Sequence, residues 1–249
     1  MARPALLLIL AFGFTLLLSP CCSVKEERGQ CPAVLRINLP SGDGGMYILL
    51  KGPDGLPETH LAPLMEEASW ASFPVSRDRF ILAVSTVPFT DSVYTVPLGK
   101  ASPELYIYRA SVKLLDESAS IVPQLRKEYC GLEVSITSQH PLPELCVRGN
   151  WNGQKADGSL LAGPFRASLK SGEQVNIPRQ GDNSLMLDVM NSSGSVLRSF
   201  AIGEYMSEAG YDWTEGSLQD LSLKVDYVNN AITLNGRAWS YTFPIKIEL

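Results

Sequence analysis

The sequence predicts an all-β protein built of two tandem β-sandwich domains with little helix. Stretch after stretch alternates apolar and polar residues with a period of two, the pattern of strands that bury one face. Turn sequences rich in glycine, aspartate and asparagine separate these stretches. After the apolar N-terminus about 220 residues remain, enough for two ordinary domains with cores of their own.

The N-terminal segment has the features of a secretory signal peptide, which we predict over residues 1–21. Arg3 precedes an apolar run of fourteen residues, 5–18, and small residues follow it. A transmembrane helix needs about 20 apolar residues, so this run is too short to span a bilayer. The segment is therefore expected to be removed and to take no part in the fold.

Two adjacent cysteines at the end of this segment predict lipoprotein processing. We predict Cys22 as the acylated residue, with Cys21 as the alternative. Several acyl chains hold a protein on a membrane where one chain does not. Residues 22–31 form a polar tether that resembles the lysine-plus-acidic signal of lipoproteins on the outer face of the Bacteroidetes outer membrane. We therefore expect a lipid-anchored, surface-exposed protein of the cell outer membrane.

One-sided strands recur along the rest of the chain. The apolar residues of 35–39 share one face, and the same alternation returns in 132–136, 185–189, 221–227 and 241–249. Such strands suit antiparallel sheets that pack face to face. The recurrence favours sandwiches over alternating strands and helices.

Three local signals refine this outline. The polar stretch 116–120 predicts a boundary between an N-terminal domain, 32–120, and a C-terminal domain, 121–249. Residues 202–209 predict a helix of two turns that Gly210 ends. Asn235 and Gly236 predict a hairpin turn before the last strand.

Charge and composition exclude several classes of function. The net charge of −5 gives no basic field, so we expect no nucleic-acid partner. His60 and His140 are the only histidines, and no cysteine pair has zinc-ligand spacing, so neither a metal nor a cofactor is expected. No nucleophile elbow, phosphate-binding loop or dinucleotide fingerprint is present. The chain is therefore predicted not to be an enzyme.

Two covalent features are candidates in the mature chain. Cys130 and Cys146 can form a disulfide in the second domain, or they can be buried free thiols. Asp91, Ser92 and Val93 match a three-residue O-glycosylation pattern of Bacteroidetes, which would place Ser92 on an exposed loop.

Both ends of the mature chain resemble the FimB-type fimbrial anchor lipoproteins of Bacteroidales, minor pilin subunits of the fimbrillin-like superfamily. The first match is the cysteine, charged tether and Cys31-Pro32 before a strand. The second is the closing segment, with residues 202–205, 210–213, 218–221 and 225–227.

The resemblance implies two transthyretin-like, Greek-key sandwiches, no catalysis and a place at the base of a pilus. There the lipid would fix the fibre to the outer membrane, and the subunit would limit fibre length. Contacts with pilin subunits of the same fimbria would use strand complementation, with 34–39 and 241–249 as candidate strands. Either strand can instead pair permanently within its own domain, which is the state we expect for both. Arg28 precedes every predicted strand, which departs from a stalk subunit matured by cleavage after an arginine.

Two alternatives keep the same architecture. One is a surface glycan-binding lipoprotein, which needs exposed aromatic side chains with polar partners; Trp151, in a polar turn, is the tryptophan expected to be exposed. The other is a tip or accessory adhesin pilin of the same superfamily.

Overall fold

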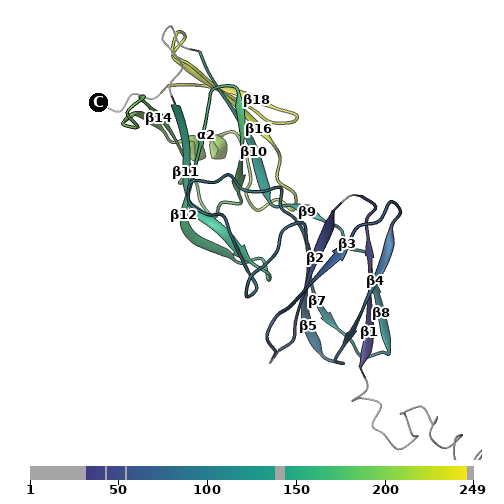
Figure 1. Cartoon of the computed structure of the whole chain (residues 1–249). Helices are drawn as coiled ribbons and strands as arrows, with labels where there is room; N and C mark the ends of the chain where they lie inside the picture. The colour runs from purple at the N-terminus through teal and green to yellow at the C-terminus, as the bar shows by residue number, and fades with distance from the viewer. Residues whose placement is uncertain (1–31, 43, 54, 138–143, 246–249) are drawn as a thin grey trace, which may run out of the picture.

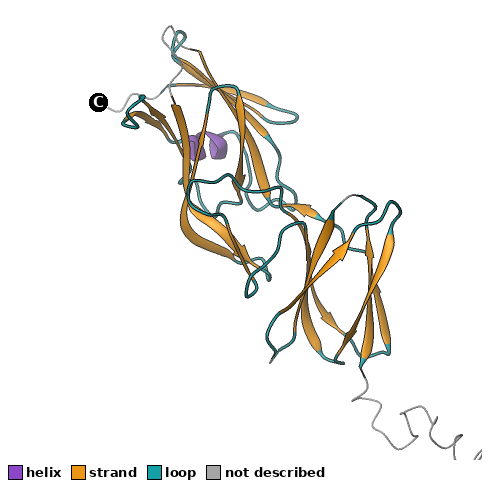
Figure 2. Ribbon diagram, viewed as in Figure 1, coloured by secondary structure: helices purple, strands orange, loops and turns teal. Residues whose placement is uncertain are grey.

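The computed structural model describes residues 32–42, 44–53, 55–137 and 144–245. The signal segment, both candidate acylation cysteines and the tether lie outside the described residues. Figure 1 shows two β-rich lobes that follow one another along the chain, and Figure 2 shows one short helix, in the second lobe. The predicted all-β fold of two sandwiches is confirmed.

The first sandwich packs a three-stranded sheet, in the order β4-β1-β8, against a five-stranded sheet, in the order β3-β2-β5-β7-β9. Its strands are β1 (Ala33–Leu39), β2 (Gly45–Lys51), β3 (Glu58–Pro63), β4 (Ser69–Val75), β5 (Arg79–Ser85), β7 (Tyr106–Lys113), β8 (Ser118–Ile121) and β9 (Arg126–Lys127).

The second sandwich packs the sheet β13-β10-β16-β17-β18 against the sheet β12-β11-β14-β15, in which β11 also pairs with β6. Its elements are β6 (Val93–Thr95), β10 (Tyr129–Thr137), β11 (Glu144–Lys155), β12 (Leu160–Leu169), β13 (Glu173–Pro178), β14 (Met186–Met190), β15 (Val196–Phe200), α2 (Ile202–Glu208), β16 (Leu221–Asp226), β17 (Ala231–Asn235) and β18 (Ser240–Pro244).

The first strand shows how alternation builds the first core. In β1, Leu35, Ile37 and Leu39 are buried, while the residues between them lie toward solvent. β1 pairs antiparallel with β4 and parallel with β8, so it is the central strand of its sheet. Ile121 of β8 pairs with Ile37, so the expected boundary after residue 120 falls inside a strand of the first sandwich.

The second core is larger and contains the single helix among the described residues. α2 lies at residues 202–208, and Gly210 follows with a φ of 80°, a left-handed conformation that glycine adopts without strain. The hairpin at Asn235 and Gly236 also forms, with the Gly236 N–H donating to the Trp239 carbonyl. Both local predictions are confirmed. Within the described ranges no helix is long and apolar enough to cross a bilayer.

Candidate functional site: an interdomain joint and the exposed sheet edges

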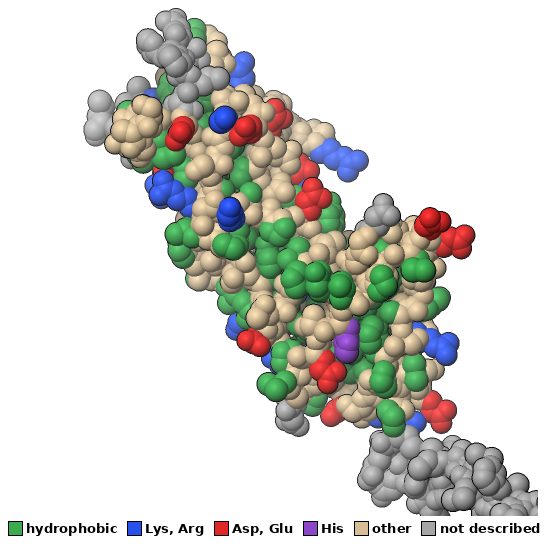
Figure 3. Space-filling model, viewed as in Figure 1, with side chains coloured by type: hydrophobic (Ala, Val, Ile, Leu, Met, Phe, Trp, Pro, Cys, Tyr) green, Lys and Arg blue, Asp and Glu red, His purple; other side chains and the backbone are tan. Residues whose placement is uncertain are grey.

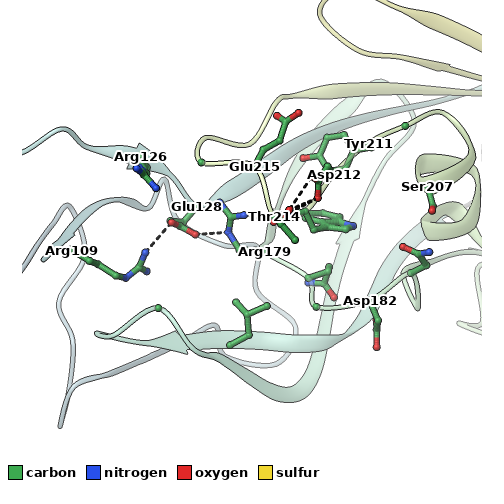
Figure 4. A pocket seen from close by; sticks show the side chains of 18 residues that line it. Arg109, Arg126, Glu128, Arg179, Asp182, Ser207, Tyr211, Asp212, Thr214 and Glu215 are labelled. Carbon is green, nitrogen blue, oxygen red and sulfur yellow. Dashed lines mark hydrogen bonds and ion pairs between the residues drawn. The ribbon is translucent and has the colours of Figure 1, made fainter. Parts of the chain in front are cut away.

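A cleft of about 670 Å³ opens where the two sandwiches meet. Figure 4 shows its side chains, which come from the first sandwich, the connection between the domains and the second sandwich. Arg109 lies on β7, Arg126 on β9, and Glu128 between β9 and β10. The second sandwich contributes Arg179, which follows β13, and the loop after α2. Further lining residues are Gly158, Leu160, Gln180, Gly181, Asp182, Asn183, Ser207 and Gly210–Gly216.

A buried carboxylate lies at the centre of this joint. Glu128 Oε1 accepts from Arg109 Nη1 at 2.9 Å, and Glu128 Oε2 accepts from Arg179 Nε at 2.5 Å. Arg109 Nη2 also donates to Gln154 Oε1 at 2.7 Å, and Arg179 Nη1 donates to the Trp213 carbonyl. Because a buried charge is costly unless it is paired and hydrogen-bonded, this arrangement holds β7, β11 and the end of β13 in one geometry. We call these four side chains, Arg109, Glu128, Gln154 and Arg179, the Glu128 cluster.

Four ionisable groups in or beside the cleft have shifted pKa values. Burial raises the pKa of Tyr211, and burial raises the pKa of the adjacent Cys130 thiol to about 12. The Thr214 N–H and hydroxyl lower the pKa of Asp212, and the Ser184 hydroxyl lowers the pKa of Asp182. Within the described residues no three metal-ligating side chains cluster.

A long loop between β5 and β7 makes the second connection between the sandwiches. Residues 86–105, which we call the inserted loop, contain β6, and β6 pairs with β11 of the second sandwich. Phe89, Tyr94 and Val96 are buried in the second core although they belong by sequence to the first domain. Gly153 makes this pairing possible, because a Cβ there would lie 2.2 Å from the Tyr94 carbonyl oxygen.

The inserted loop also determines how far Ser92 is exposed. The side chain is 6% exposed, and its hydroxyl has no hydrogen-bond partner among the described residues. The Ser92 carbonyl accepts from the Ala156 N–H at 2.8 Å, which fixes the loop against the second sandwich. The expectation that Ser92 lies on an exposed loop is wrong, because docking of the loop buries it. A glycan on this hydroxyl would require the loop to leave its place.

The two candidate disulfide cysteines are both buried free thiols. Cys130 lies on β10 and Cys146 on β11, in different sheets of the second sandwich. Arg166 Nε donates to Cys146 Sγ at 3.1 Å. The two cysteines therefore form no disulfide with each other. Of the two states that the sequence allowed, the structure has the buried free thiols.

Trp151 does not form an exposed aromatic platform. It lies on β11, and its indole ring packs so closely on Gly181 that a Cβ there would lie 2.7 Å from the ring. Its indole nitrogen is buried. In the cleft, Tyr211 and Trp213 are buried. Their ring centroids lie 4.9 Å apart in an edge-to-face contact. These tryptophans therefore contribute to packing.

The sheet edges are the remaining candidate sites. β18 ends its sheet, so among the described strands its outer backbone groups have no partner strand. The register places Tyr241 and Phe243 opposite the buried Leu234 and Ile232, on the side of the sheet that faces the core. Tyr241 contacts the rings of Trp239 and Phe243 and is 47% exposed. The edge therefore presents backbone groups beside a row of aromatic side chains.

No family model matches the chain, and no curated protein matches it. Solved structures do match. The fimbrial anchor protein Mfa2 from Porphyromonas gingivalis aligns with a TM-score of 0.59 at 12% identity, over 84% of this chain and 99% of that chain. This chain shares the fold of Mfa2.

Two further structures, both from Bacteroides thetaiotaomicron, have the same fold. A candidate adhesin aligns with a TM-score of 0.58 at 13% identity, over 92% of this chain and 100% of that chain. A candidate polysaccharide-binding protein aligns with a TM-score of 0.59 at 9% identity, over 86% of this chain and 98% of that chain. Each of these three alignments covers most of this chain and nearly the whole of the other chain.

Proposed function

We propose that this chain is a lipid-anchored minor pilin that attaches a fimbrillin-type pilus to the outer membrane and limits its length. The observation that carries the proposal is the match to Mfa2, a fimbrial anchor protein, over nearly the whole of both chains. The cysteine pair at the end of the signal segment supports the lipid. The resemblance of both chain ends to FimB-type anchors supports the same role.

The arrangement of the two ends supports this proposal. In Figure 1 the chain enters the first sandwich through β1 at the end far from the second sandwich, and β18 lies in the upper part of the second. A lipid on Cys22 and a partner subunit at β18 would therefore act at opposite ends. The Glu128 cluster and the inserted loop join the sandwiches between these ends, so force on one domain is transmitted to the other.

β18 is the contact that we propose for a neighbouring pilin. A strand added at this edge would gain main-chain hydrogen bonds, and its alternate side chains would meet the aromatic row. β1 is less suited to this contact, because it already pairs on both sides within its own sheet. The partner strand would come from another pilin of the same fimbria.

Deletion of the gene followed by electron microscopy of the surface fibres tests the proposal. We expect detached or over-long pili, and complementation with the wild-type gene should restore cell-bound fibres of normal length. Unchanged fibres in the deletion strain would contradict an anchoring role.

A further inference from the structure

The end of the first sandwich from which the chain runs to the tether carries exposed apolar side chains. Leu56, in the loop between β2 and β3, is 89% exposed, and Leu115, in the loop between β7 and β8, is 67% exposed. Figure 3 shows hydrophobic side chains at the surface of this end, with charged side chains among them. We call this end the tether pole.

Hydrogen bonds and a shared hollow place these loops together. Leu56 lines a hollow of about 370 Å³ with Asp78, which lies in the loop between β4 and β5. The Leu114 N–H donates to the Asp78 carbonyl at 3.2 Å, so the loop that carries Leu115 lies on the same residue. The Val34 N–H donates to the Glu117 carbonyl at 2.9 Å, which joins the start of β1 to that loop. Both leucines therefore surround the point where the chain enters the fold.

The length of the tether fixes how far this pole can be from a membrane. From Cys22 to Ala33 the chain spans at most about 40 Å even when fully extended. Among the ends of the molecule, the tether pole is thus the one held at the lipid surface. Tethering turns a weak contact into an intramolecular one with a high effective concentration.

The charges of the pole favour an apolar contact over an electrostatic one. The basic residues Arg77 and Lys113 lie close in sequence to the acidic residues Asp78 and Asp116, so signs are mixed and no basic field attracts anionic headgroups. Transfer of exposed leucine side chains out of water lowers the free energy, and the interfacial region of a bilayer accepts apolar side chains.

We propose that the tether pole docks on the bilayer, with Leu56 and Leu115 inserted into the lipid interface. The proposal rests on the lipid anchor of the proposed function. Docking would add two protein contacts to the acyl anchor and would hold the first sandwich against the membrane. The second sandwich, joined through the Glu128 cluster, would then project away from the surface.

The test uses the mature protein as extracted with detergent from the cell envelope, placed in vesicles of phosphatidylethanolamine and phosphatidylglycerol that contain a phospholipid with a photoreactive acyl chain. Peptide mapping should find lipid crosslinks at Leu56 and Leu115. In the double variant Leu56→Glu and Leu115→Glu, crosslinking at the pole should fall about tenfold, because burial of leucine is lost. Leu98→Glu is the matched control, since Leu98 is 66% exposed on the inserted loop, and it should leave crosslinking at the pole unchanged.

The intact mass of the same sample separates this proposal from the anchor. Acyl mass with no crosslinks at the pole would overturn the docking proposal and leave the anchor standing. A chain without acyl mass would overturn both. Crosslinks at the pole that disappear in high salt would contradict insertion by leucines, because salt screens charge contacts and not apolar ones.

Discussion

Glu128 is held by two guanidinium groups from different domains, and its carboxylate is almost fully removed from solvent. Buried ion pairs contribute little relative to a well-packed apolar replacement, but removal of one partner leaves an uncompensated charge. The value of Glu128 to this molecule therefore lies in fixing the position of Arg109 against Arg179.

Glu128→Gln should lower the free energy of unfolding by about 3 kcal/mol, because two partly buried arginines lose their buried counter-charge. Chemical denaturation of the mature chain measures this. Glu133→Gln, an exposed carboxylate on β10, is the control and should change stability by less than about 0.5 kcal/mol. Equal effects of the two variants would show that the Glu128 cluster does not hold the joint.

Cys130 should be inert while the protein is folded. Its pKa is raised to about 12 from the usual 9.0 by burial, so the reactive thiolate is scarce at neutral pH. Because the folded-state pKa is the higher one, the associated stability is complete below pH 9 and is lost as the pH rises from 9 toward 12. Iodoacetamide should label Cys130 only after unfolding, as read by peptide mass. Rapid labelling in the native state, or a peptide linked to Cys146, would contradict the buried free thiol.

The inserted loop is the element that joins the two cores. Tyr94→Ala should lower the free energy of unfolding by about 3 kcal/mol, because truncation of a buried aromatic side chain leaves a cavity. Limited proteolysis should also cut the loop faster, since one of its buried anchors in the second core is gone. Leu98→Ala on the same loop should be nearly neutral. If the Tyr94 variant were cut as slowly as the wild type, the backbone pairing of β6 with β11 would be enough to hold the loop in place.

β18 is the element proposed to receive a neighbouring subunit. Tyr241→Lys places a charge on the core-facing side of an edge strand, a substitution that opposes edge-to-edge pairing. Binding of the neighbouring pilin should weaken at least about tenfold, equivalent to about 1.4 kcal/mol. Thr242→Lys, on the opposite face of β18, should bind nearly as the wild type does. Binding assays with the purified pilin measure both, and unchanged binding of the Tyr241 variant would place the contact elsewhere.

Strands that bury one face could be predicted, because their side chains alternate with a fixed period. The strand starting near Leu132 and the helix ended by Gly210 are examples. The inserted loop could not be predicted, because its buried residues, such as Phe89 and Tyr94, meet partners that are distant in sequence. The burial of Ser92 follows from this loop. Glu128 gave no signal either, since a single carboxylate beside two basic residues is typical of a solvated surface.

The two ends of the molecule carry different features. One end leads to the tether and carries exposed leucines, and the C-terminal sandwich presents the free edge of β18. Two connections, the Glu128 cluster and the inserted loop, make the sandwiches one unit between them. This arrangement suits a subunit that is fixed to a surface at one end and holds a fibre at the other.

The amount of pilin in the cell-free medium is the most direct test of lipid anchoring. It should be compared between wild-type cells and cells in which both Cys21 and Cys22 are replaced and export uses an ordinary cleavable signal peptide. The anchor predicts that most fibres leave the cells of the variant strain and carry this subunit with them. Fibres that stay cell-bound, with normal length, would contradict a lipid-anchored pilus base.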